Sequence, residues 1–179
     1  MWKENRLKRI DSTQKEAIRR IKTGKINKPE FFYSFDQFDG YGTHGRKWEK
    51  SKESLAISFA WPKLLTPKLD KIIFPIIFST FVVEDIEKFM NYPKYSLGLK
   101  WPNDLMKEEK KIGGVLVQTI NQNLEEWFVV GLGINLFWCP LDFNHSYGSL
   151  LTNNDECFPK DELVSTVFET MRKIFLICI

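Results

Sequence analysis

The chain has 179 residues, 43% of them hydrophobic and 15% aromatic, which is enough to build the core of a globular domain. Its formal charge of +3 is mild, so composition does not by itself indicate a nucleic-acid partner. The three cysteines, Cys139, Cys157 and Cys178, are odd in number and lack metal-ligand spacing, which argues against a disulfide framework and a zinc site.

Neither a signal peptide nor a membrane helix is predicted. The segment 1–9 is charged and does not lead into an apolar stretch. The most apolar window, 72–83, is interrupted by Pro75 and falls short of the ~20 residues that a membrane helix needs. We therefore expect a cytoplasmic protein without a membrane partner.

A short strand ending at Ile10 and a helix from Ser12 to Gly24 are predicted at the start of the chain. Ser12 is a favourable N-cap, because its hydroxyl can accept a hydrogen bond from the first helical turn. A helix N-terminus also attracts polar ligands, so capping and ligand binding are compatible here. A second strand follows at 31–35.

The segment 36–48 contains three glycines within six positions, followed directly by Arg46 and Lys47. Flexible backbone N–H donors beside two cations suit a loop that closes over phosphate, and Trp48 can pack at its base. The alternative is a surface loop with a solvated basic end, because a glycine pattern alone is weak evidence.

A third strand is predicted at 55–61, and the connector 62–67 leads to a long helix at 68–90. Apolar residues recur in this helix at helical spacing, so one face should cover the sheet. Pro75 is a candidate site for a kink near its start.

The stretches 99–106 and 110–117 are the central motif, predicted as a strand, a turn and a second strand. The turn carries Asn103 and Asp104, and Lys111 stands at the start of the second strand, before Gly113 and Gly114. Adjacent glycines leave backbone that a ligand can approach closely, so the hairpin has the composition of a pocket wall. The alternative is an ordinary hairpin with a solvated lysine.

A further strand is predicted at 127–135. Gly131 and Gly133 lie on one side of it and would admit a flat ligand, although a bulge or a close strand crossing explains them as well. Asn135 ends the strand with an amide that can both donate and accept.

The segment 138–159 has the composition of a loop, and a final helix is predicted at 163–177. The chain ends in the apolar run 174–179, which we expect to be covered by the sheet or by another subunit. No repeat, linker or break in composition divides the sequence, so a single domain is predicted over 1–179.

Four motifs make the chain similar to the catalytic domain of biotin protein ligases. In chain order they are Asp11-Ser12-Thr13, the loop ending in Gly45-Arg46-Lys47-Trp48, the block Lys100-Trp101-Pro102-Asn103-Asp104-Leu105 with Lys111-Ile112-Gly113-Gly114, and Gly131-Leu132-Gly133-Ile134-Asn135. They follow the order of the family and span most of the chain.

The resemblance implies an α+β fold with a mixed, mainly antiparallel central sheet and helices mostly on one face, related to class II aminoacyl-tRNA synthetases. Short connections between the predicted strands also favour antiparallel neighbours. The resemblance is to the stand-alone type of ligase, so an N-terminal DNA-binding winged helix and a C-terminal small β-barrel are both expected to be absent. We expect a monomer or a homodimer and no nucleic-acid partner.

The same resemblance implies a reaction in two steps. Biotin and Mg·ATP give biotinyl-5′-AMP and pyrophosphate, and a lysine of a biotin carboxyl carrier protein of acetyl-CoA carboxylase then attacks the adenylate. A cation at Lys111 would neutralise charge in both steps.

By resemblance, the catalytic residues are Lys111, Arg46 and Asp104, and Asp104 places Mg²⁺ or orients Lys111. Biotin is assigned to Ser12, Thr13, Gln37, Gly40, Gly42, Lys111, Gly113, Gly114 and Leu116. ATP and the adenylate are assigned to Gly42, Thr43, His44, Gly45, Arg46, Lys47, Trp48, Asn103 and Asn135.

The chain departs from the family at Thr43, where members usually carry an arginine. That arginine is expected to order the loop over the adenylate, and a neutral His44 is a poorer phosphate clamp. We therefore expect faster escape of biotinyl-adenylate than in a relative with the arginine. Two alternatives stay open: a lipoate-type ligase with the same adenylate chemistry, and a catalytically impaired module that binds biotin or a carrier domain.

Overall fold

The computed structural model describes residues 1–48, 53–137, 146–152 and 157–179. Within these ranges it contains a seven-stranded sheet and three α-helices. Their order is β1 (Lys3–Arg6), α1 (Thr13–Lys22), β2 (Glu30–Ser34), β3 (Glu53–Pro62), α2 (Phe74–Phe89), β4 (Leu97–Lys100), β5 (Asp104–Lys107), β6 (Lys110–Gln122), β7 (Glu125–Phe137) and α3 (Lys160–Cys178).

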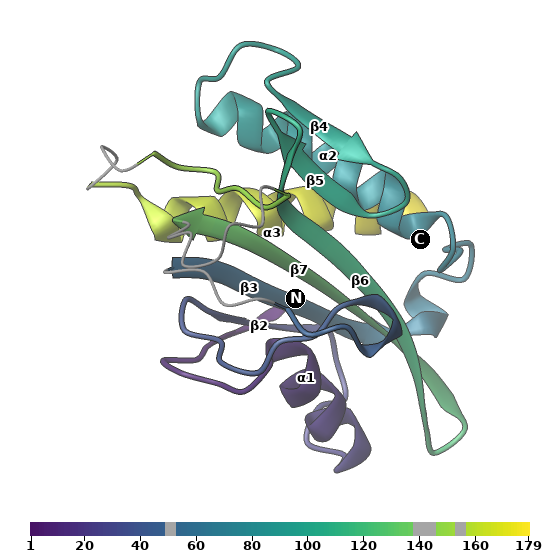
Figure 1. The fold of residues 1–179 in the computed structure, drawn as a ribbon. Helices are drawn as coiled ribbons and strands as arrows, with labels where there is room; N and C mark the ends of the chain where they lie inside the picture. Colours follow the sequence, from purple (N-terminus) through teal and green to yellow (C-terminus); the bar gives the residue numbers. More distant parts are fainter. Residues whose placement is uncertain (49–52, 138–145, 153–156) are drawn as a thin grey trace.

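The sheet has the strand order β1-β2-β3-β7-β6-β5-β4. Every neighbouring pair is antiparallel except β1 and β2, which confirms the predicted mixed, mainly antiparallel sheet. The long hairpin of β6 and β7 forms its centre (Figure 1). Asn123 and Leu124 join these strands with φ of 49° and 66°, as the tight turn of a hairpin requires.

The two faces of the sheet carry different helices (Figure 1). On one face α2 and α3 pack over large buried side chains of the sheet such as Phe59 and Leu132, and Phe78 of α2 lies in the same core. On the other face α1 packs through Ala17 and Ile21 against Phe32. Two of the three helices therefore share a face, as predicted.

Small residues occupy the part of the α1 face that lies beyond the helix. Because side chains alternate along a strand, paired positions of neighbouring strands share a face. These positions are Ala56 and Ser58 on β3, Gly131 and Gly133 on β7, and Gly114 on β6. The sheet is therefore hollowed on the side where the predicted site residues meet.

The start of the chain and α2 differ from the prediction. The first strand ends at Arg6, and Ile10 instead forms an isolated bridge to Gln37. Helix α2 begins at Phe74 because Asp70 Oδ1 accepts hydrogen bonds from the backbone N–H groups of residues 72 and 73 and so holds a turn before the helix. Pro75 lies in the first turn, where its missing N–H has no cost, so the predicted kink is wrong.

The central motif contains one strand more than predicted. Strands β4 and β5 pair with each other on either side of the turn 101–103, and β5 then pairs with β6. The turn contains a cis peptide bond between Trp101 and Pro102. Both predicted segments of the hairpin are present, and the extra pairing makes this edge of the sheet three strands wide.

The end of the chain is partly buried. Ile174 of α3 lies in the core, whereas Leu176, Ile177 and the terminal Ile179 are exposed.

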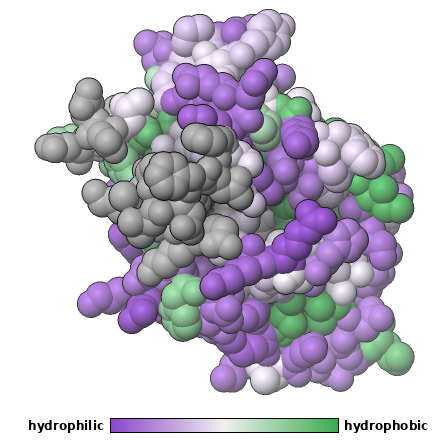
Figure 2. All heavy atoms as spheres, viewed as in Figure 1, coloured by the Kyte–Doolittle hydropathy of each residue, from purple (hydrophilic) through white to green (hydrophobic). Residues whose placement is uncertain are grey.

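Part of the predicted loop at 138–159, including Cys139, lies outside the described residues. Cys157 and Cys178 are free thiols. In the described part of the chain no helix is long and apolar enough to cross a membrane. The face shown in Figure 2 is mainly hydrophilic.

Candidate active site

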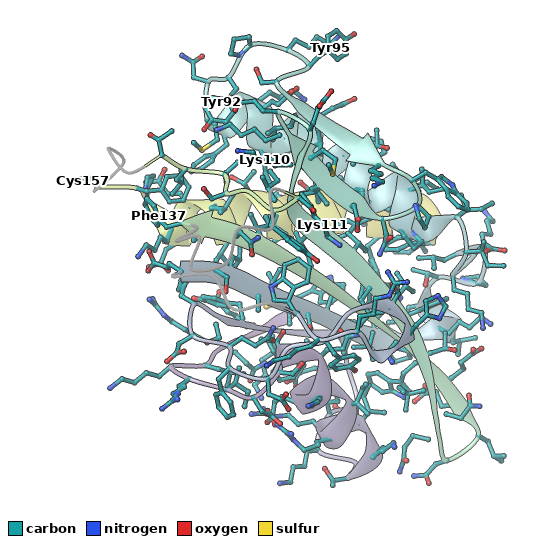
Figure 3. The ribbon with its side chains drawn as sticks, viewed as in Figure 1. Tyr92, Tyr95, Lys110, Lys111, Phe137 and Cys157 are labelled. Atoms are coloured by element: carbon teal, nitrogen blue, oxygen red, sulfur yellow. The ribbon has the colours of Figure 1, made fainter. Side chains whose placement is uncertain are left out.

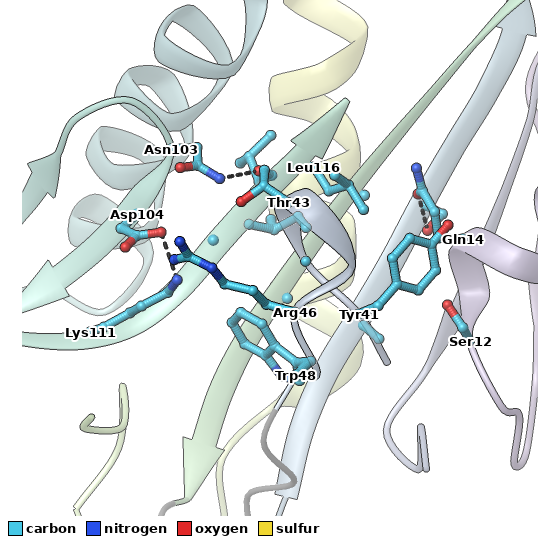
Figure 4. Close-up of a pocket in the computed structure, with 18 of the residues that line it drawn as sticks. Ser12, Gln14, Tyr41, Thr43, Arg46, Trp48, Asn103, Asp104, Lys111 and Leu116 are labelled. Atoms are coloured by element: carbon cyan, nitrogen blue, oxygen red, sulfur yellow. Dashed lines mark hydrogen bonds and ion pairs between the residues drawn. The ribbon is translucent and has the colours of Figure 1, made fainter. Parts of the chain in front are cut away.

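A cavity of about 610 Å³ opens on the hollowed face of the sheet. Figure 4 shows Ser12, Gln14 and Tyr41 on one side of it, and Asp104 and Lys111 on the other. The cavity brings together most of the residues that the sequence predicts for substrate binding. They are Ser12, Thr13, Gln37, Gly42, Thr43, His44, Arg46, Lys47, Trp48, Asn103, Asp104, Lys111, Gly114, Leu116 and Asn135.

Three predicted glycines do not line the cavity. A Cβ on Gly113 would lie 2.7 Å from the carbonyl oxygen of Gly133, so Gly113 permits β6 and β7 to approach closely. Gly40 is buried against Gln37, and Gly45 has a φ of +71° in the tip of the loop. Gly113 and Gly40 are thus explained by close packing, and Gly45 by its left-handed backbone conformation.

The ion pair between Lys111 and Asp104 stands at one end of the cavity. Lys111 Nζ lies 2.6 Å from Asp104 Oδ1 and 5.5 Å from the centroid of the Trp48 ring. Both side chains of the pair are only 25% exposed, so solvent screens their charges less than those of a surface pair. Figure 3 shows Lys111 beside Lys110, whose side chain is exposed. A single fixed cation thus faces the cavity from the start of β6.

Two asparagines lie near this ion pair. Asn103 Nδ2 donates to the carbonyl oxygen of Val115 at 2.7 Å, which fastens the turn 101–103 to β6. Asn135 is 1% exposed, and its Nδ2 donates to the carbonyl oxygen of Gly148 at 3.2 Å. Asn135 Oδ1 has no hydrogen-bond partner within the described ranges. A buried acceptor without a donor is costly, so this oxygen is suited to a donor from a ligand.

A chain of hydrogen-bonded side chains forms the opposite end of the cavity. Gln14 Nε2 donates to the carbonyl oxygen of Val129 at 3.1 Å, which fixes the orientation of the amide. Gln14 Oε1 therefore accepts from Ser58 Oγ at 3.0 Å. Ser58 has a single proton, so Thr13 Oγ1, 2.9 Å away, must be the donor to Ser58 Oγ. Thr13 Oγ1 keeps acceptor capacity toward the cavity.

The N-terminus of α1 is held in place at this polar end. Ser12 Oγ accepts from Lys15 N, which confirms the predicted N-cap. Asp11 Oδ1 accepts from Ser12 N at 2.7 Å, and the carboxylate receives hydrogen bonds from Arg19 at 2.7 and 2.9 Å. The guanidinium of Arg19 lowers the pKa of Asp11 from 3.8 to about 2.

We expect Asp11→Asn to lower the free energy of unfolding at neutral pH by about 1 kcal/mol, less than the full pKa shift implies because Arg19 is 48% exposed. A carboxyl whose pKa falls on folding stabilises the protein above its ordinary pKa, and this stability is lost between about pH 4 and about pH 2. Urea unfolding across this window should therefore show a shallower loss in the variant than in the wild type. Arg19→Met should flatten the same slope, and equal slopes in all three proteins would contradict the assignment.

Side chains of the protein occupy part of the space above two glycines of β7. A Cβ on Gly133 would lie 3.1 Å from the indole of Trp48, and a Cβ on Gly131 would lie 2.6 Å from Gln14 Oε1. Both glycines nevertheless line the cavity, so the interpretation that they admit a flat ligand stays a prediction. Trp48 and Gln14 form part of the cavity wall as well.

The sequence prediction omits several residues of the wall, among them Gln14, Tyr41, Ser58 and Tyr147. Ser58 carries a signal, because its hydroxyl interrupts the apolar run from Leu55 to Pro62 in β3. Tyr41 also carries one, since it stands between two glycines of the loop. Tyr147 carries none, because it reaches the site through a bridge to Lys111 from a distant part of the chain.

A metal would find one carboxylate in the described part of this wall, that of Asp104. The described residues contain no group of three or more His, Cys, Asp or Glu that could hold a metal ion. Mg²⁺ is often bound by one or two carboxylates together with substrate phosphates. The wall therefore fits a magnesium ion that arrives with a nucleotide.

The sequence is similar to that of known protein ligases. The model of the biotin/lipoate A/B protein ligase family matches residues 7–135. A biotin–[acetyl-CoA-carboxylase] ligase of Mycobacterium tuberculosis is 23% identical over 141 residues, which cover 78% of this chain and 52% of the relative. The corresponding ligase of Paracoccus denitrificans is 28% identical over 137 residues, which cover 75% of this chain and 55% of the relative. The chain thus spans about half the length of these curated relatives.

A solved structure has a similar fold. The biotin protein ligase of Aquifex aeolicus, in complex with biotin and ATP, is 25% identical and superimposes with a TM-score of 0.75. The match covers 97% of this chain and 70% of the Aquifex chain. Since the family model alone matches more than half of the sequence, this chain belongs to the biotin/lipoate A/B protein ligase family.

Proposed function

We propose that this chain is an ATP-dependent biotin–protein ligase. It would convert biotin and ATP to biotinyl-5′-AMP and pyrophosphate, and then transfer biotin to a lysine of a biotin carboxyl carrier protein. The observation that carries the proposal is Lys111, a cation paired with Asp104 inside a cavity whose two ends differ in chemistry. The biotin ligases among its relatives support the choice of substrate.

The polar end of the cavity suits the ureido group of biotin. This group has two N–H donors and one carbonyl acceptor, and Thr13 Oγ1 has acceptor capacity for such a donor. Ser12 and Gln37 line the same cavity, and Leu116 supplies an apolar contact for the carbon skeleton. The dithiolane ring of lipoate has no N–H group and would leave these polar side chains without partners, which favours biotin over lipoate.

In the first step an oxygen of the biotin carboxylate attacks the α-phosphorus of ATP, and the bond to pyrophosphate breaks. Lys111 would neutralise the charge that builds on the α-phosphoryl oxygens, and Asp104 would orient Lys111 through their 2.6 Å contact. Arg46 and the backbone of the loop 42–48 would contact the phosphates. Mg²⁺ accompanying ATP would supply further charge neutralisation, with Asp104 as the carboxylate available to it.

In the second step the amine of a carrier lysine attacks the carbonyl carbon of the mixed anhydride. The bond from this carbon to the phosphate oxygen breaks, AMP leaves and the amine loses a proton. Lys111 would again stabilise the departing phosphate. Asn135 would hold the adenine, because its Oδ1 needs a donor and the exocyclic amine of adenine supplies one.

Thr43 lines the cavity but brings no charge to it. The faster escape of biotinyl-adenylate expected from this residue stays a prediction. It is checked by the biotinylation of a bystander protein in the presence of the carrier, and labelling confined to the carrier would contradict it.

Exchange of labelled pyrophosphate into ATP tests the proposed function, with biotin and lipoate in parallel. Exchange that depends on biotin, followed by transfer to a carrier domain, is the expected result. Exchange with lipoate alone would assign a lipoate-type ligase. A folded protein that binds biotin without exchange would be a binding module instead.

A further inference from the structure

The segment 36–48, here called the glycine-rich loop, has a first half that is hydrogen-bonded to the start of the chain and a second half that is exposed. In the first half, Phe38 N donates to Ile10 O and Asp39 N donates to Asp11 O, at 3.0 and 2.8 Å. The Asp39 carboxylate also pairs with Lys15 of α1. In the second half all residues of the segment 43–47 are exposed, and two of them have left-handed backbone conformations.

Tyr41 stands at the border between these halves. Its hydroxyl donates to Gln118 Oε1 of β6 at 2.8 Å, so the bond ties the loop to the sheet. Lys15 Nζ lies 5.7 Å from the centroid of the Tyr41 ring. Burial raises the pKa of Tyr41, so the hydroxyl keeps its proton at neutral pH. Figure 4 shows the ring extending from the loop toward Gln14.

The bond of Tyr41 is one link in a closed circuit. Gln118 Oε1 also accepts from Gln14 Nε2 at 3.1 Å, and Gln14 leads through Ser58 to Thr13. Thr13 N then donates to Gln37 Oε1 at 2.9 Å. The circuit therefore begins and ends on the loop, and it includes side chains at the polar end of the cavity. A ligand that binds at this end meets the same network that fastens the loop.

We propose that Tyr41 is a latch, whose hydrogen bond to Gln118 holds the glycine-rich loop over the cavity and lengthens the stay of a bound ligand. Tyr41 is a positioning residue, because it acts through the loop. Its effect on ligand residence rests on the proposed function, whereas its effect on the loop does not. The two effects are therefore tested separately.

The first test uses the protein without ligand. Arg46 and Lys47 are exposed in the loop, so trypsin can cleave after them when the loop opens. Tyr41→Phe removes the hydroxyl and keeps the ring, and we expect cleavage at these two sites to become about fivefold faster, the factor set by one net hydrogen bond. Tyr33→Phe is the matched control, because the Tyr33 hydroxyl also donates a hydrogen bond, to Glu4, but lies outside the cavity wall.

A double variant separates the latch from a general loss of stability. Gln118→Leu should speed cleavage as Tyr41→Phe does, and the double variant should be no faster than the faster single variant. Tyr33→Phe loses a comparable hydrogen bond, so we expect it to lower the melting temperature about as much as Tyr41→Phe does. Only Tyr41→Phe should also speed the cleavage of the loop. Unchanged cleavage in Tyr41→Phe, or strictly additive effects, would overturn the latch.

The second test measures dissociation of biotin. Tyr41→Phe should raise the dissociation rate about fivefold, while Tyr33→Phe should match the wild type. Faster cleavage with unchanged dissociation would overturn the effect on ligand residence. A wild-type protein that binds no biotin would contradict the proposed function. The cleavage experiment would then still test whether Tyr41 holds the loop.

Discussion

Lys111→Ala is expected to lower biotin-dependent pyrophosphate exchange by about 10²- to 10³-fold, the loss seen when one fixed electrostatic contact to a transition state is removed. The reason is the position of the side chain, which lies inside the cavity and 2.6 Å from Asp104. Within the described ranges Lys111 is the lysine that pairs with Asp104, so its loss also leaves this carboxylate without that partner.

The adjacent lysine provides a matched control. Lys110→Ala removes the same charge one residue away, but Lys110 is exposed and does not line the cavity. It should therefore leave the exchange rate within about twofold of the wild type. Circular dichroism and thermal unfolding must show that both variants fold. Equal activity of Lys111→Ala and Lys110→Ala would contradict the role proposed for Lys111.

Local chemistry made part of the site predictable. The cap at Ser12 and the polar residues around Lys111 follow turn and strand signals within a few residues, and the structure brings them to one cavity. The start of α2 was harder to predict, because Ile72 and Ile73 fit the helical spacing although the turn held by Asp70 precedes the helix.

Contacts between distant segments could not be read from the sequence. The circuit through Gln14, Ser58 and Gln118 depends on the register of three strands and on the placement of α1. Likewise, nothing in the local sequence indicates that Trp48 would cover Gly133. Glycine patterns mark where backbone is bare, but only the packed structure shows whether a ligand, a side chain or another strand occupies that space.

Gly113 and Gly114 illustrate this difference and give the second large prediction. Gly113→Ala should lower the free energy of unfolding by about 2 kcal/mol or more, since its Cβ would lie 2.7 Å from the carbonyl oxygen of Gly133 and the central strands would have to separate. For a chain of this size the melting temperature should fall by about 4–8 °C. Differential scanning calorimetry and urea unfolding measure both quantities.

Gly114→Ala should affect activity more than stability, in contrast to Gly113→Ala. Its Cβ would meet its nearest neighbours, among them Asp104 Oδ1 and Lys111 Cε, at an ordinary 3.5 Å, so the stability should change by no more than about 0.5 kcal/mol. The methyl group would nevertheless enter the cavity beside the ion pair and should lower the efficiency of biotin-dependent exchange about tenfold. A stable Gly113→Ala protein, or a Gly114→Ala protein that loses stability but not activity, would reverse these assignments. The expected pair of results would show that of two adjacent glycines one serves the sheet and the other the ligand.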